Sequence, residues 1–345
     1  MRSYLLSYWG GSVLGGMIVF LLFTFVTFFV EGCSSSNQEK REVAVDTAKI
    51  YLTDRKCDDA LSVLEDVGRD NKDAKYVQAL ASAYACRANY STLVFYGTNL
   101  DKIKSDLDHF FGSLTTFTTS LMIDPEDANY TNLQTAINLL LYAGDVLIPS
   151  SVERAKVFSS DDAGNINMQA LYMVLTQLGK YIFYYGNADP QTGTKGGGSS
   201  SNGNPNQFSN GCIYEYNPSN PILALLMSAA RATGELGSCT SNATGSPKLL
   251  ALPNANTTKR MCQGIVLFNT LLDLVFNTVL PADSKALTNL RTTFEQLCSG
   301  GTYAQYVGDL CNVKIQSSCE TNYATPPESD KLQAYFFLIF EKMFI

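Results

Sequence analysis

Apolar residues recur at every third or fourth position over most of this chain, and no stretch alternates apolar and polar residues over a sustained length. The first spacing is typical of an amphipathic α-helix, whereas strict alternation is typical of a half-buried β-strand. The pattern therefore predicts an all-α protein built from helical hairpins. The segments with the clearest helical spacing are 42–88, 168–185, 221–231 and 259–280.

The N-terminal segment 1–32 has the pattern of an export signal. A run of fourteen uncharged, mostly apolar residues at 17–30 follows Arg2, and this length fits the core of a signal peptide. A second interpretation is an uncleaved anchor, because the twenty uncharged residues of 11–30 are enough to span a bilayer. Both interpretations predict that residues 38–345 lie outside the cytoplasm.

Cys33 follows the apolar run after Glu31 and Gly32. A small residue and then Cys at this place resembles the lipobox of bacterial lipoproteins, although an uncharged residue is usual at the position of Glu31. The resemblance implies that Cys33 is lipidated and that residues 33–41 begin with this Cys and form a polar tether. In that family, a Ser such as Ser34 after the acylated Cys implies transport to the outer membrane, on its periplasmic side. The alternative is an inner-membrane anchor with a periplasmic domain.

Residues 42–149 carry a second resemblance. Small and large residues stand where a tetratricopeptide repeat has its packing positions, at Ala48, Tyr51, Ala60, Leu64 and Val67. A weaker copy follows thirty-three residues later, and residues 117–127 resemble the proline-bearing corner that closes such a repeat. The resemblance implies a helical-hairpin solenoid or bundle, in which each helix pair buries its apolar face against the next pair.

The chain has nine Cys, so eight remain when Cys33 carries lipid. An even number of Cys in an exported protein predicts disulfides that staple the fold. The eight candidates are Cys57, Cys86, Cys212, Cys239, Cys262, Cys298, Cys311 and Cys319.

The repeat resemblance also implies one pairing. It places Cys57 at the start of one helix and Cys86 at the end of its antiparallel neighbour, where the two Cα atoms lie close enough for a disulfide. In the C-terminal cluster, a pairing of Cys311 with Cys298 and a pairing with Cys319 both stay open.

Residues 150–345 continue as a helical region, either a separate domain or more of the same array. A Gly-, Ser- and Asn-rich stretch at 187–211 predicts a flexible loop. Polar side chains recur every four residues in the apolar helix 259–280, at Asn269, Asp273 and Asn277. This stripe predicts a packed amphipathic helix, not a membrane span. Its polar face is either a hydrogen-bonded edge of the core or the ligand-facing lining of a cavity or groove.

The segment after Pro327 is apolar nearly all round. Such a helix is buried, lies in an interface or contacts a membrane. We expect it to close the core of the helical body.

The composition limits the classes of function that we expect for this chain. The net charge is −7, and no basic run offers a surface to nucleic acid. We find no motif for an enzyme, a cofactor or a metal site. The single His, His109, is predicted on a helix surface, and the acidic stretch 161–165 lacks the spacing of a calcium loop, which predicts a turn.

The sequence thus predicts a lipid-anchored, helical-repeat lipoprotein of a bacterial envelope. Its expected role is that of a scaffold or adaptor for envelope protein partners. The alternative is an accessory subunit that carries a small molecule or lipid for an envelope transporter. The sequence does not indicate a partner, a ligand or an oligomeric state.

Overall fold

A computed structural model shows how the chain folds. It describes residues 36–104, 109–122, 124, 126–186, 188–193, 220–232, 249, 252, 254–277, 292, 294–300, 303–341 and 343. Across these residues the elements are helices and helical turns, and no β-strand is present. The all-α prediction is therefore confirmed.

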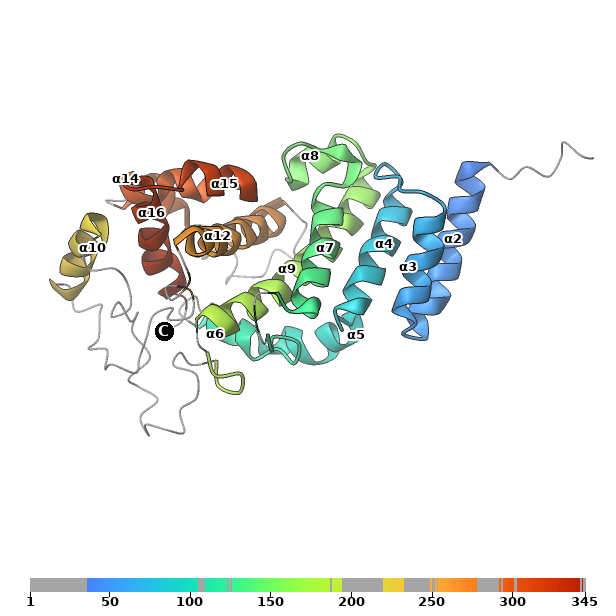
Figure 1. The fold of residues 1–345 in the computed structure, drawn as a ribbon, viewed down its shortest axis with the longest axis horizontal. Coiled ribbons are helices and arrows are strands. Elements are labelled where there is room, and N and C mark those ends of the chain that lie inside the picture. The colour runs from blue at the N-terminus through green and yellow to red at the C-terminus, as the bar shows by residue number, and fades with distance from the viewer. Residues whose placement is uncertain are drawn as a thin grey trace, which may run out of the picture.

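Antiparallel helices stand side by side in the N-terminal half (Figure 1). In chain order they are α2 (Asn37–Thr53), α3 (Cys57–Asp66), α4 (Ala74–Arg87), α5 (Thr92–Val94), α6 (Phe110–Thr115), α7 (Ala128–Leu141), α8 (Ser151–Ala155) and α9 (Ser160–Tyr185). Side-chain caps start several of them. For example, the carboxylate of Asp73 accepts a hydrogen bond from the backbone N–H of Tyr76 at 3.0 Å, which satisfies one of the free donors at the start of α4.

The first hairpin consists of α2 and α3. Ala48, Ala60 and Leu64 are completely buried between α2, α3 and α4. The hydroxyl of Tyr76 on α4 donates to the carbonyl of Leu64 at 2.9 Å, which ties the next helix to this hairpin. The small residues let neighbouring helices approach closely.

The elements that follow α4 are short. They are the helix α5, the turns η2 (Phe95–Asn99) and η3 (Leu100–Lys102), and the helix α6. Gly97 and several β-branched residues weaken helix formation here. The buried side chain of Asn99 instead accepts hydrogen bonds from the N–H and hydroxyl of Thr118. Helix α7 then packs directly on α4.

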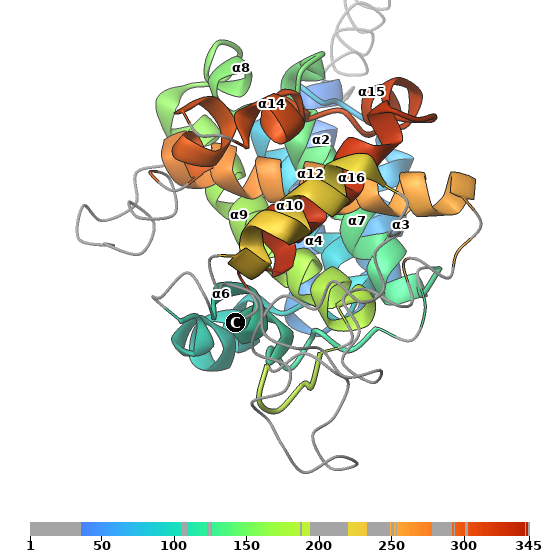
Figure 2. The same cartoon turned by 90° about the vertical axis from the view of Figure 1, so that its left-hand side faces the viewer.

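The C-terminal half is built around one long helix. It contains α10 (Pro221–Ala232), α12 (Asn254–Asn277), α14 (Ala304–Val307), α15 (Gln316–Asn322) and α16 (Glu328–Tyr335), with the helical turns η7 (Gln296–Gly300), η8 (Gly308–Asn312) and η9 (Phe336–Glu341). Helix α12 packs on α9, α15 and α16. Helix α10 lies against α16 at the end of the molecule that faces the viewer in Figure 2. No helix among the described residues is long and apolar enough to cross a membrane.

The C-terminal segment closes the core, as we expected. Its large apolar side chains that the structure describes are buried: Leu332, Tyr335, Phe336, Phe337, Leu338, Ile339, Phe340 and Met343. The ring of Phe340 lies 5.0 Å from that of Phe111 on α6 and 6.0 Å from that of Phe268 on α12. One apolar core therefore joins the two halves.

Three disulfides connect described residues. Cys57–Cys86, with a Cα–Cα distance of 5.5 Å, is the predicted pair and links α3 to α4. In the C-terminal cluster, Cys298 pairs with Cys311, whereas Cys319 pairs with Cys262 across 57 positions. The open alternative is thus decided for Cys298–Cys311.

Some predictions fall outside the described residues: the segment 1–32, Cys33, Cys212, Cys239, and residues 187 and 194–211 of the predicted loop. One prediction is wrong. The expected turn at 161–165 is the first part of α9, where the hydroxyl of Ser159 accepts from the N–H of Asp162 at 3.2 Å. The acidic residues favour a helix start because they face the positive end of the helix dipole.

Candidate functional site: a cleft between α7 and α12

A cleft of about 200 Å³ lies between α7, α12 and the segment that leads into α15. Its apolar walls come from Ile137, Leu141, Val266 and Leu267. Its polar lining comes from Gln134, Asn138, Lys259, Gln263, Thr270, Lys314 and Gln316. The cleft therefore offers both apolar contacts and hydrogen-bonding groups, a combination that suits a polar ligand with an apolar part.

The floor of the cleft holds a polar atom without a partner. Thr270 is 1% exposed, and its hydroxyl has no hydrogen-bond partner among the described residues. Leaving a buried hydroxyl unpaired costs about 1–3 kcal/mol. The oxygen itself lies beneath the cleft surface, so the polar groups that a ligand can reach are those of the other lining side chains.

The rim of the cleft is open to solvent. Asn138 and Tyr142 from the α7 side are exposed, and so is Lys259 from α12. Partial burial raises the pKa of Tyr142, so its hydroxyl stays protonated at neutral pH. Amide, hydroxyl and ammonium groups at the rim can donate hydrogen bonds to carbonyl or carboxylate oxygens.

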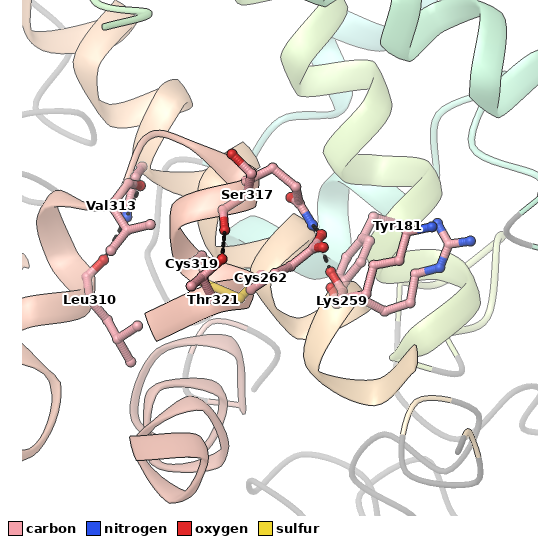
Figure 3. Close-up of a disulfide and its surroundings, with 12 residues drawn as sticks. Tyr181, Lys259, Cys262, Leu310, Val313, Ser317, Cys319 and Thr321 are labelled. Atoms are coloured by element: carbon pink, nitrogen blue, oxygen red, sulfur yellow. Dashed lines mark hydrogen bonds between the residues drawn. A yellow bond between two sulfur atoms is a disulfide. The ribbon is translucent and has the colours of Figure 1, made fainter. Parts of the chain in front are cut away.

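A disulfide holds one side of the cleft in place. Figure 3 shows Cys262 on α12 bonded to Cys319 on α15, with Lys259 one turn away. The amide of Gln316 donates to the carbonyl of Lys259 at 2.8 Å. The disulfide and this hydrogen bond both join α15 to α12. The distance between Lys259 and Gln316 across the rim is therefore fixed.

The predicted polar stripe lies on α12 beside this cleft. The buried amide of Asn269 donates to the carbonyls of Leu310 and Val313, both at 2.8 Å. Asn277, at the end of α12, is exposed and donates back to the carbonyl of Asp273 at 2.9 Å. These bonds bind α12 to its neighbours and cap its last turn.

Asp273 is the charged member of the stripe. Its side chain is 6% exposed and accepts from the ammonium of Lys314 at 2.6 Å, and the other oxygen accepts from the N–H of Ser151 at 2.8 Å. Lys314 also lines the cleft. Through Lys314, Asp273 is the member of the stripe that is bonded to a residue of the cleft lining. The side chains of Asn269 and Asn277 bond to backbone carbonyls instead.

A second buried charge lies behind Asp273. Arg154 on α8 is completely buried, and it donates to the side-chain oxygen of Asn167 at 2.7 Å and to the carbonyl of Leu141 at 2.8 Å. Burial lowers the pKa of Arg154 to about 10, and the nearby carboxylate of Asp273 opposes this shift. Arg154 thus holds α8 against α9 and α7, and the bond from Ser151 to Asp273 holds it against α12.

Sequence reasoning missed the part of the cleft that α7 supplies. The stripe marked the correct region of α12, but Thr270 lies one position beyond Asn269 and carries no polar periodicity of its own. His109 is exposed immediately before α6, and it does not line this cleft. Within the described part of the chain, no group of three or more His, Cys, Asp or Glu side chains is arranged to hold a metal ion.

Comparisons of this chain with protein-family models, with curated proteins and with solved structures gave no match. Its function is therefore argued from the cleft and from the sequence.

Proposed function

We propose that this chain is a membrane-anchored helical scaffold of a bacterial envelope, which holds a segment of a partner protein in the cleft between α7 and α12. The observation that carries the proposal is an open cleft whose apolar walls stand beside the side-chain amides of Gln263 and Gln316 and the ammonium of Lys259. Binding sites combine apolar walls with a few polar groups in this way, so a partner segment at this place has a physical reason.

A peptide segment suits the rest of the lining. The side-chain nitrogen of Gln263 can donate to a peptide backbone and the side-chain oxygen of Gln316 can accept from it, because a backbone carries both donors and acceptors. Lys259 offers a positive charge to an acidic side chain or a terminal carboxylate. A volume of about 200 Å³ is below the usual range for drug-sized ligands, and the open rim lets a longer chain pass across it.

The membrane part of the proposal rests on the sequence. The apolar run 17–30 and the lipobox-like Cys33 support an anchor, and the disulfides support an oxidising compartment such as the periplasm. An outer-membrane lipoprotein that faces the periplasm fits both features. The inner membrane is the alternative location.

Site-specific photocrosslinking in native membranes tests the partner. A photoreactive amino acid replaces Asn138, which lines the cleft, and in a matched control it replaces Asn132, which lies on the same helix α7 outside the cleft. We expect a single crosslinked protein, identified by its peptides, at least fivefold more abundant from position 138. The filling variant Gln263→Trp should reduce that product.

The same experiment separates the two functions. Equal crosslinking from both positions, or none from either, would contradict a partner in this cleft. In that case native mass spectrometry of the purified chain would test the accessory ligand carrier. A bound small molecule or lipid that Gln263→Trp removes would then assign the cleft to a carried ligand.

A further inference from the structure

An apolar tip projects from the body at α8 and the loops on either side of it. It consists of Leu147, Ile148, Val152 and Val157, which are 87%, 51%, 51% and 45% exposed. These four aliphatic side chains stand within eleven consecutive residues, and none of them fills the core. A contiguous exposed apolar surface is typical of a site that contacts a membrane or another protein.

The tip is a rigid part of the fold. Below it, the N–H of Ser151 donates to the carboxylate of Asp273 on α12 at 2.8 Å. The buried guanidinium of Arg154 donates to Asn167 on α9 and to the carbonyl of Leu141 on α7. Bonds to three long helices therefore hold α8, and the aliphatic side chains keep their outward position.

Contacts place this tip beside the start of α2. The guanidinium of Arg41, in the first turns of α2, pairs with Asp70 at 2.9 Å. The next residue, Asn71, donates to the carboxylate of Asp145 at 2.8 Å, and its carbonyl accepts from the N–H of Gly144 at 2.7 Å. Asp145 lies two positions before Leu147. Figure 1 shows α8 and the beginning of α2 along one edge of the molecule and α5 along the opposite edge.

The anchor predicted from the sequence enters at this same edge. Helix α2 begins at Asn37, four residues after Cys33. Four extended residues reach at most about 14 Å. An anchor at Cys33 therefore keeps the edge that carries the tip close to the bilayer surface, and an anchor at 17–30 keeps it within about 25 Å of that surface.

We propose that the apolar tip inserts into the interfacial region of the membrane that anchors the chain, so that helices α2, α4 and α7 stand end-on to the bilayer with α8 against the lipid. This inference rests on the proposed membrane anchoring. The four side chains are aliphatic, whereas protein interfaces are enriched in aromatic residues and Arg. Glu153 on α8 and Lys156, the residue after α8, pair with each other at 2.5 Å, so this pair brings no net charge to the lipid surface.

Depth-dependent fluorescence quenching tests the orientation. The sequence has one Trp, Trp9, so the full-length chain is prepared with Trp9→Phe and one new Trp. The test variant is Leu147→Trp in the tip. The matched control is Leu93→Trp on α5, because Leu93 is 85% exposed and Leu147 is 87% exposed. Each chain is reconstituted from detergent into phosphatidylethanolamine–phosphatidylglycerol vesicles with and without brominated lipid, and circular dichroism checks the fold.

We expect brominated lipid to quench the Leu147→Trp fluorescence at least twofold and to leave the Leu93→Trp fluorescence within one tenth of its value. Ile148→Trp repeats the test should Leu147→Trp fail to fold. Quenching of both positions, or of neither, would overturn the end-on orientation.

Vesicle flotation of the unsubstituted chain separates this inference from the proposed anchor. A chain that floats while position 147 stays unquenched keeps the anchor and overturns the inserted tip. A chain that does not float overturns both the anchor and the inserted tip that depends on it.

Discussion

The hydroxyl of Tyr335 on α16 donates a hydrogen bond of 2.8 Å to the side-chain oxygen of Asn269 on α12, and both residues are buried. Both the oxygen and the nitrogen of the Asn269 side chain are thereby hydrogen-bonded, because the nitrogen also donates to the carbonyls of Leu310 and Val313. One side chain of the predicted stripe thus joins α12 to η8, to the segment after it and to the C-terminal helix.

Tyr335→Phe should lower the free energy of unfolding by about 1–3 kcal/mol, because it leaves the buried oxygen of Asn269 without its donor. Tyr185→Phe is the matched control. Tyr185 is equally buried, but its hydroxyl has no partner among the described residues, so we expect a change below about 0.5 kcal/mol or a small gain. Urea unfolding followed by circular dichroism measures both. Equal losses would show that the hydroxyl bond to Asn269 contributes nothing specific.

Gly264 on α12 meets Tyr181 on α9 too closely for any side chain. An added Cβ would lie 2.7 Å from the Tyr181 ring, whose hydroxyl donates to the carbonyl of Arg260. Gly264→Ala should therefore destabilise the protein by about 1–3 kcal/mol through overpacking. Gly164→Ala on α9 meets open space and should stabilise it by about 0.5–1 kcal/mol, because Ala favours a helix. Thermal unfolding of the two variants checks the opposite signs, and a shift of the same sign in both would contradict the close contact.

The three disulfides should differ in their contributions to stability. In the chain-entropy model, the stabilisation grows with loop length, and the separations are 57, 29 and 13 positions. Removing Cys262–Cys319 should cost about 4 kcal/mol, Cys57–Cys86 about 3.6 kcal/mol and Cys298–Cys311 about 3 kcal/mol. Paired Cys→Ala variants, compared by urea unfolding, test this order. A peptide map without reductant checks the three pairings first, and a missing linked peptide would exclude the corresponding pair.

Alkaline pH should unfold this protein. Burial raises the pKa of several tyrosines above the ordinary value of 10, most strongly for Tyr130, Tyr181 and Tyr335. The folded state therefore keeps these protons where the unfolded state releases them. Their stabilisation is complete below pH 10 and is lost as the pH rises through the folded-state values, by about 1.4 kcal/mol per pH unit for each tyrosine.

Arg154 acts in the opposite direction. Its folded-state pKa of about 10 is below the ordinary value of 12.5, so above pH 10 the unfolded chain binds more protons at this one site. Because several tyrosines oppose one arginine, we expect the free energy of unfolding to be level to about pH 9 and to fall above pH 10. Urea unfolding at pH 8, 10 and 11, with free thiols blocked, measures this slope. Tyr335→Phe should make the slope shallower, and a slope unchanged by it would contradict the role of this buried phenol.

Local patterns determined much of the fold. The helical class, the first hairpin and the burial of the C-terminal segment all follow from apolar residues three and four positions apart, which share one face of a helix. The Cys57–Cys86 pair was also predictable, because a repeat-like hairpin brings the start of α3 beside the end of α4 within a short stretch of chain.

Only the tertiary structure decided how these helices meet. Asp273 accepts from Ser151 across 122 positions, and Cys262 joins Cys319 across 57. A periodic pattern records which face of a helix is buried, but not which distant segment covers it. The cleft at Thr270 and the apolar tip at Leu147 arise where such distant segments come together, and for this reason the sequence predicted the helices themselves but neither of these two surfaces.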